Sequence, residues 1–216
     1  MISKKALCSL FIFALIFLNS CIGLKADIAV RQEGSGTIEL EYRLSRLAES
    51  LGRLDGNAEW LTIPIGRADF ERTVARVDGL SMRSFSSRNE GNDIVNTVKL
   101  EFDSVETLVR FLDATQQRVS PPNQQNSSIF MTLTRGQPID ADLLELFTTV
   151  SEGYFININF TAPQDATLTL FNNNGEHVTN TDGITLVPSG RRVSLLSPVG
   201  TLLAFREGLS MQLSFR

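Results

Sequence analysis

The chain has few of the residues on which metal sites, disulfide frameworks and many catalytic sites depend. Its 216 residues include two cysteines, Cys8 and Cys21, and one histidine, His177. No cysteine follows position 21, so the rest of the chain can form no disulfide, no thiolate nucleophile and no cysteine-ligated zinc site. A single histidine likewise excludes a multi-histidine metal centre.

Short catalytic and nucleotide-binding motifs are missing as well. There is no GxSxG, no Walker loop and no GxGxxG, and Gly34-Ser35-Gly36 by itself is typical of a turn. We therefore expect a protein that is not an enzyme, with no catalytic, metal-binding or cofactor-binding residue and no cofactor.

Positive charge is also scarce. The formal net charge is −4 at neutral pH. Nucleic-acid binding normally uses a basic face, and adhesion to anionic lipid needs clustered lysine or arginine. Net charge therefore predicts no nucleic-acid partner, and any attachment to a membrane must come from something other than bulk charge.

No apolar run is long enough to span a bilayer. Residues 6–18 are apolar over 13 positions and follow Lys4 and Lys5, whereas a spanning helix needs about 20. A short apolar run behind a basic start is typical of a signal peptide. The next residues, Leu18-Asn19-Ser20-Cys21, resemble the lipobox of bacterial lipoproteins, in which an aliphatic residue, a tolerant position and a small residue precede the cysteine. Asn19 is a less usual choice at the tolerant position.

The resemblance implies cleavage before Cys21 and a diacylglyceryl thioether, with palmitate-type acyl chains, on its sulfur. An ordinary secretory signal cut near Ala26 and an uncleaved anchor are the alternatives. On the lipoprotein interpretation residues 1–20 are the signal peptide and residues 21–26 are the lipidated cysteine and a short tether. Removing residues 1–20 removes two lysines and no acid, which leaves a net charge of −6. The chain would belong to the bacterial cell envelope as a membrane-anchored lipoprotein, periplasmic or surface-exposed.

Residues 27–216 predict a single α+β domain, with a mostly antiparallel sheet of hairpins and three to four packed helices. Strict alternation predicts strands at residues 27–32, 37–44, 80–88, 93–102, 128–135, 154–162 and 209–215. Further strands are expected at 167–171, 183–187 and 191–196, and an ambiguous strand or bridge at 59–65. Helical spacing predicts helices at 45–51, 67–78, 103–116, 140–150 and 197–205. Residues 116–126 are expected to form a loop. The β-rich part 163–216 could form a small separate β element, but we expect the terminal strand to join the main sheet.

The segment Asp27-Ile-Ala-Val-Arg-Gln-Glu-Gly-Ser-Gly-Thr-Ile-Glu-Leu, directly after a lipobox, resembles the start of LppM-type lipoprotein domains. The apolar helix expected at 197–205 also resembles that group, and the chain is similar in outline to uncharacterised lipoproteins of spirochaetes. The resemblance implies helices packed on an antiparallel sheet, with the hydrophobic cavity and glycolipid binding associated with mycobacterial members. Its only specific part is about 14 residues, and it transfers no binding residue.

Four groups of polar residues are candidate sites, and a structural role explains each of them at least as well. His177 lies in a turn sequence. Asp140, Asp142 and Glu145 fall at the start of an expected helix, where acids favour the helix dipole. Arg191 and Arg192 would point to opposite faces of a strand. Asn157, Asn159 and Thr161 alternate along a strand and fit either an exposed sheet face or a glycan-binding groove.

The sequence thus predicts a lipid-anchored, non-catalytic envelope lipoprotein that binds a lipid or another apolar ligand. Its predicted contacts are the membrane, through the lipid on Cys21, and a lipid ligand or a neighbouring envelope protein. The alternative is a structural or assembly lipoprotein that docks other envelope proteins through an exposed sheet edge.

Overall fold

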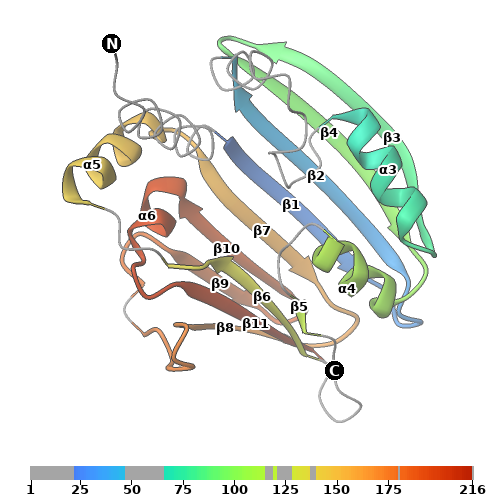
Figure 1. The fold of residues 1–216 in the computed structure, drawn as a ribbon. Helices are drawn as coiled ribbons and strands as arrows, with labels where there is room; N and C mark the ends of the chain where they lie inside the picture. The colour runs from blue at the N-terminus through green and yellow to red at the C-terminus, as the bar shows by residue number, and fades with distance from the viewer. Residues whose placement is uncertain are drawn as a thin grey trace.

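The structure, a computed structural model, describes residues 22–46, 66–114, 119–120, 128–136, 140–179 and 181–215. Strands make up about 52% of it, and its helices have only 6 to 10 residues each. The α+β class dominated by strands is confirmed (Figure 1). The prediction of three to four packed helices overstated the helical part of the fold. The predicted helix 45–51 beyond Arg46, the segment 59–65, the signal peptide and Cys21 lie outside the described residues.

A seven-stranded sheet forms the larger layer, in the order β3-β4-β2-β1-β7-β10-β9. Its N-terminal hairpin is β1 (Ile22–Val30) and β2 (Gly36–Ser45), and its second hairpin is β3 (Leu80–Glu90) and β4 (Asp93–Phe102). β7 (Phe155–Thr161) lies parallel to β1, while β10 (Arg192–Pro198) and β9 (Thr185–Ser189) continue antiparallel. This sheet is therefore mixed rather than purely antiparallel.

A four-stranded antiparallel sheet forms the smaller layer, in the order β5-β6-β11-β8. It consists of β5 (Val119–Ser120), β6 (Ser128–Thr134), β8 (Ala166–Phe171) and β11 (Leu209–Phe215). The expectation that the terminal strand joins the main sheet was wrong, because β11 pairs with β6 and β8. The smaller sheet packs on the larger one through aromatic rings, with the centroids of Phe160 and Phe215 5.3 Å apart.

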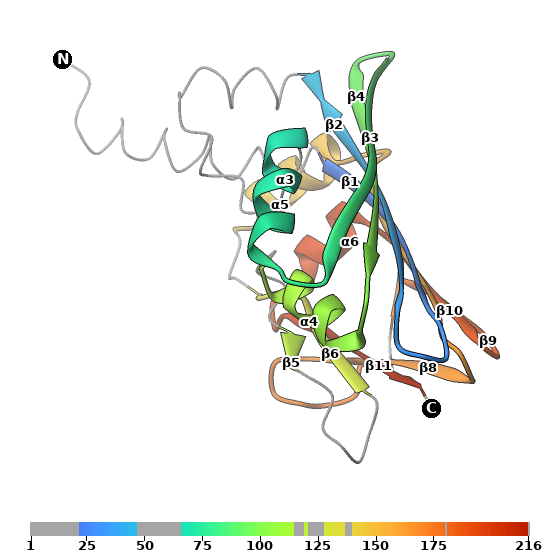
Figure 2. The ribbon, with the colours of Figure 1, turned by 90° about the vertical axis from the view of Figure 1, so that its right-hand side faces the viewer.

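All four described helices lie on one side of the large sheet, and its other face is uncovered (Figure 2). They are α3 (Arg67–Arg76), α4 (Val105–Ala114), α5 (Ala141–Val150) and α6 (Val199–Ala204). Helical spacing in α3 directs Phe70 inward, where it is fully buried, and Gly79 follows that helix with φ +86°. In α4, Leu108 and Phe111 are buried in the same core.

The alternation seen in the sequence sorts the large sheet into an apolar inner face and a polar outer face. In β2, Ile38, Leu40, Tyr42 and Leu44 are buried, whereas the intervening Glu39 is exposed and Glu41 and Arg43 are partly so. The fold therefore places an aliphatic wall beneath the helices and the small sheet, and a charged wall on the opposite side.

Several predicted boundaries need correction. β1 begins at Ile22, so residues 22–26, predicted as a tether, are paired with β2 inside the sheet. The predicted loop 116–126 contains β5, which pairs with β6. The helix predicted from residue 103 begins at Val105, and its cap is Ser104, whose hydroxyl accepts a hydrogen bond from the Thr107 N–H at 3.2 Å. Ser197 is buried at the end of β10, and α6 begins only at Val199.

Candidate functional site

An apolar cavity of about 200 Å³ lies against the inner face of the large sheet. The floor comes from three adjacent strands. Every second residue of β1 contributes, namely Ile22, Leu24, Ala26 and Ile28. The neighbouring strands add Ile38, Leu40, Tyr42, Ile156 and Ile158. The period of two in each strand places these side chains on one face, because successive side chains alternate across a sheet.

The roof of the cavity comes from three elements that are distant in sequence. α4 supplies Phe111 and Leu112, β6 supplies Met131 and Leu133, and α6 supplies Val199 and Leu202. All of these side chains are apolar, and most of them are buried. A cavity with such walls holds few ordered waters and favours apolar ligands.

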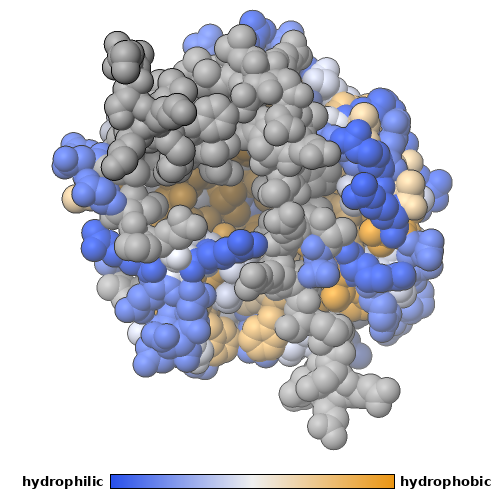
Figure 3. Space-filling model, viewed as in Figure 1, coloured by the Kyte–Doolittle hydropathy of each residue, from blue (hydrophilic) through white to orange (hydrophobic). Residues whose placement is uncertain are grey.

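Partly exposed side chains mark the mouth of the cavity. Among the lining residues Ile22, Leu24, Leu133 and Ile156 are partly exposed, whereas Ala26, Ile28, Ile38 and Phe111 are buried. Ile22 and Leu24 lie at the start of β1, so the mouth lies at the N-terminal end of that strand. Figure 3 shows hydrophobic residues at the bottom of a hollow on this face, beside α6.

Tyr42 is the one lining residue, of those described, whose side chain can donate a hydrogen bond. It lies opposite Leu24 on β1, and its side chain is 3% exposed. Its ring contacts that of Phe70 from α3, with centroids 6.1 Å apart. Burial raises the pKa of the Tyr42 phenol well above its usual value, because the apolar surroundings disfavour the phenolate.

A second hollow, open and polar, lies beside α3. It measures about 550 Å³ and is lined by Arg46, Gly66, Arg67, Phe85, Ser87, Asn89, Ile94 and Asn96. The Arg67 guanidinium lies 5.3 Å from the centroid of the Phe85 ring and donates to the Phe85 carbonyl oxygen at 3.1 Å. This arginine is therefore held against its own protein surface.

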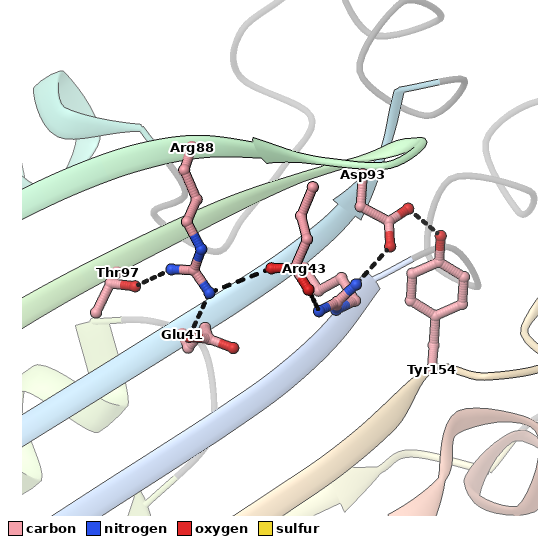
Figure 4. A network of polar contacts seen from close by, with 7 residues as sticks. Glu41, Arg43, Arg88, Asp93, Thr97 and Tyr154 are labelled. Atoms are coloured by element: carbon pink, nitrogen blue, oxygen red, sulfur yellow. Dashed lines mark hydrogen bonds and ion pairs between the residues drawn. The ribbon is translucent and has the colours of Figure 1, made fainter.

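The outer face of the large sheet carries a network of charged and polar side chains near the β3–β4 turn (Figure 4). Arg43 donates to Glu90 at 2.8 Å and to Asp93 at 3.0 Å. The Tyr154 hydroxyl, just before β7, donates to the second oxygen of Asp93 at 2.8 Å. The hydrogen bond from Arg43 lowers the pKa of Glu90 below its usual range. The network joins β2, β4 and the segment before β7, and we interpret it as structural.

The four groups of polar residues considered as candidate sites in the sequence do not form a common site. Asp140 directly precedes α5, and its carboxylate accepts the Asp142 N–H at 3.0 Å at the start of that helix. His177 is exposed and packs its ring against Phe171 at 4.5 Å between centroids. Arg191 donates to the Ala162 carbonyl oxygen at 3.2 Å, and Arg192 is exposed.

The row Asn157, Asn159 and Thr161 lies on the outer face of β7, on the side opposite the cavity. Asn159 is buried there and accepts a 2.7 Å hydrogen bond from the Ser194 hydroxyl of β10. Its carbonyl oxygen is thus engaged within the sheet. This pairing favours the interpretation of the row as a sheet face over that of a glycan groove.

The described residues lack two features that are relevant to chemistry and to membrane attachment. No cluster of three histidine, cysteine or acidic side chains suited to a metal ion occurs in that part of the chain. None of its helices combines the length and the apolar character needed to cross a bilayer. Cys21, the predicted lipidation site, lies outside it, directly before the first described residue.

No family model, curated protein or solved structure matched the chain. The cavity itself was not located from the sequence, because its walls come from β1, β2, β7, α4, β6 and α6. One signal was available. Tyr42 is the only polar-tipped side chain in the inward-facing row Ile38, Leu40, Tyr42 and Leu44.

Proposed function

We propose that this protein is a lipid-anchored lipoprotein of the bacterial cell envelope that binds an apolar or lipid ligand without catalysis. The observation that carries the proposal is the cavity on the inner face of the large sheet. Fourteen of its fifteen described lining residues are aliphatic, methionine or phenylalanine. Such walls bind a ligand by removing apolar surface from water, which yields about 25 cal/mol per Å².

The size of the cavity limits what it encloses. Pockets that surround a drug-sized ligand measure roughly 300–1,000 Å³, and this one measures about 200 Å³. It therefore suits one acyl chain or a comparable apolar segment rather than a whole two-chain lipid. The remainder of a larger ligand would lie outside the mouth.

The position of the mouth fits the proposed anchor. Ile22 lines the mouth and follows Cys21 directly, so a lipid on Cys21 would hold the mouth near the headgroups of the membrane. Because residues 22–26 lie inside β1, almost no free chain would separate the folded domain from the bilayer. This arrangement would let an acyl chain pass between membrane and cavity over a short path.

Docking of envelope proteins through a sheet edge is the less supported alternative. β3 at one edge has an irregularity between Met82 and Ser84, and the intervening Arg83 is paired with Glu101. β9 at the other edge contains Pro188. Bulges, charges and proline are the features by which edge strands avoid pairing with other chains.

The test is native mass spectrometry of the processed protein, released from detergent micelles and compared with the same sample after denaturation. A covalent lipid on a chain beginning at Cys21 would persist after denaturation. A lipid in the cavity would add a second mass that denaturation removes. The proposal fails if the native protein carries no removable lipid and takes none up from a membrane lipid extract. Crosslinking in cells that recovers a specific envelope protein in that case would favour the docking alternative.

A further inference from the structure

Large apolar side chains gather at one place on the uncovered outer face of the large sheet (Figure 2). Four large hydrophobic side chains of the described residues are exposed, and three of them, Phe155, Leu196 and Val187, lie on the neighbouring strands β7, β10 and β9. They are diagonal neighbours, since Leu196 pairs with Asn157 on β7 and with Thr185 on β9. Such diagonals are about 7–8 Å apart, within reach of large side chains. We call these three residues the outer apolar patch.

The outer face of the sheet is divided into a charged half and an almost uncharged half. β2, β4 and β3 carry outward ion pairs, such as that of Glu39 with Lys99. The outward rows of β7, β10 and β9, strands that are described in full, contain no acid, and Arg192 at their far end is their one charged residue. Moving a carboxylate out of water is costly unless it is compensated. The half that carries the patch is therefore the one suited to contact with an apolar surface.

The patch lies at the end of the sheet where the described chain begins. β7 runs parallel to β1 with Ile156 beside Leu24, which places Phe155 level with Gly23. Cys21, the lipid anchor in the proposed function, precedes Gly23 by two residues, or about 7 Å of strand. The mouth of the cavity opens on the inner face of the same end. This end of the sheet is therefore apolar on both faces.

The size of the patch favours a lipid surface over a protein partner. A stable protein interface buries roughly 800 Å² on each partner. Three side chains, none of them more than 51% exposed, supply much less. A bilayer needs no such area from the patch, because an acylated Cys21 would supply the attachment and the patch would only fix the orientation.

We propose that the outer apolar patch inserts into the interfacial region of the bilayer beside the anchor, so that this end of the sheet rests on the membrane. The inference rests on the anchor of the proposed function and adds a second contact to it. Phe155 lies deepest, Leu196 follows two residues further from the start of β1, and Val187 lies two residues further still. The charged half stays in water, where its carboxylates keep their hydration.

The test places one fluorophore on a new cysteine of the lipidated protein in phosphatidylcholine vesicles. Leu196→Cys puts it in the patch. Ser86→Cys, the first control, is an exposed position level with Leu196 on the charged half. Arg192→Cys, the second, is exposed four residues away on the strand of Leu196. Iodide in the water quenches fluorophores outside the bilayer, and nitroxide-labelled lipids quench those inside it. Thermal unfolding of each variant in detergent micelles checks the fold.

We expect iodide to quench the fluorophore at position 196 at least about threefold less than at the two control positions, because ions stay out of the apolar layer. Nitroxide lipids should quench it at least about threefold more. Equal iodide quenching at all three positions would overturn the inference and leave the proposed function intact. Weak iodide quenching without nitroxide quenching would mean that protein covers the fluorophore, which also overturns the inference.

The unsubstituted protein tests the anchor separately. No cysteine follows Cys21, so a processed chain acylated there should take up no thiol-reactive fluorophore and should float with the vesicles. Labelling of that protein, together with failure to float, would show an unmodified cysteine. That result would overturn the anchor and, with it, the inference.

Discussion

The ring of Phe102 covers the backbone of Gly36, its partner across β2 and β4. A β-carbon at Gly36 would overlap that ring and also the carbonyl oxygen of Ala29. An aromatic side chain laid over a strand glycine fills the gap that the missing side chain leaves. The pair closes the inner face of the large sheet at the end opposite the mouth of the cavity.

Gly36→Ala should therefore destabilise the protein, because the added methyl group forces the ring or the backbone to move. We expect a loss of about 1–3 kcal/mol in the free energy of unfolding, measured in urea. Gly23→Ala is the matched control in the neighbouring strand. There the nearest atom to an added β-carbon, the Phe155 carbonyl oxygen, lies at 3.4 Å, and we expect a change within about 0.5 kcal/mol. Similar losses in the two variants would contradict the packing described.

Filling the cavity should block ligand uptake. Ala26 lies in its floor, whereas Ala29 of the same strand points to the opposite face. Ala26→Leu adds three carbon atoms inside the cavity, and we expect it to weaken uptake of N-phenylnaphthylamine by about tenfold or more. Ala29→Leu adds the same atoms outside and should leave uptake unchanged. An equal effect of both substitutions would place the bound probe elsewhere on the molecule.

The ion-pair network on the outer face should make stability depend on acidity. Glu90 has a lowered pKa chiefly because Arg43 donates a hydrogen bond to it. A carboxyl whose pKa is lower in the folded state stabilises the fold at pH above its unfolded pKa, near 4.5, and that contribution is lost as pH falls through the folded pKa. Arg43→Gln should therefore reduce the drop in unfolding temperature between pH 7 and about pH 3.

Arg192→Gln serves as the control for that measurement, since Arg192 is an exposed arginine on the far half of the same sheet. It should retain the wild-type pH profile. If Arg43→Gln retained it too, the network would have no measurable linkage to folding.

Asp140 should contribute to stability as a helix cap rather than to chemistry. Its carboxylate accepts the Asp142 N–H at the start of α5, and its carbonyl oxygen accepts the Leu144 N–H at 2.9 Å. Asp140→Ala should lower the free energy of unfolding by about 1 kcal/mol, whereas the exposed Glu145→Ala should change it by less than about 0.5 kcal/mol. Chemical denaturation of both variants distinguishes them. Loss of ligand uptake in Asp140→Ala at unchanged stability would point instead to a functional carboxylate.

Local pattern predicted the strands well, because alternation is a property of a single segment. The strands predicted at 37–44 and 93–102 are present as β2 and β4, and their alternating rows through Ile38 and Leu40 and through Val98 and Leu100 are buried. Partnership between distant strands was not predictable in this way. The local sequence of Leu209–Phe215 does not indicate whether this strand pairs with β6 or joins the larger sheet. The local sequence of β1 likewise does not indicate its parallel partner β7, in which Ile156 pairs with Leu24 across 132 positions of sequence.

The sequence predicted a class of protein, one that binds an apolar ligand, but not the residues of the site. An apolar interior rich in phenylalanine is compatible with a filled core and with a cavity, and the sequence alone left both open. What separates them is the distance between the sheet and its covering layer, which depends on α4, α6 and β6 together. The lipidation of Cys21 stays a prediction from the lipobox.

The parallel pairing of β1 with β7 also bears on the order in which the protein folds. β1 has β2 as a local partner, but its other edge stays open until residues 155–161 have been made. β1, the first strand of the described chain, therefore gains its second strand partner late in folding. Until then its apolar side chains lack their distant packing partners. Because closing such long loops is slow, we expect slow folding of the whole domain, with the Ile22–Val30 strand vulnerable to aggregation until β7 arrives.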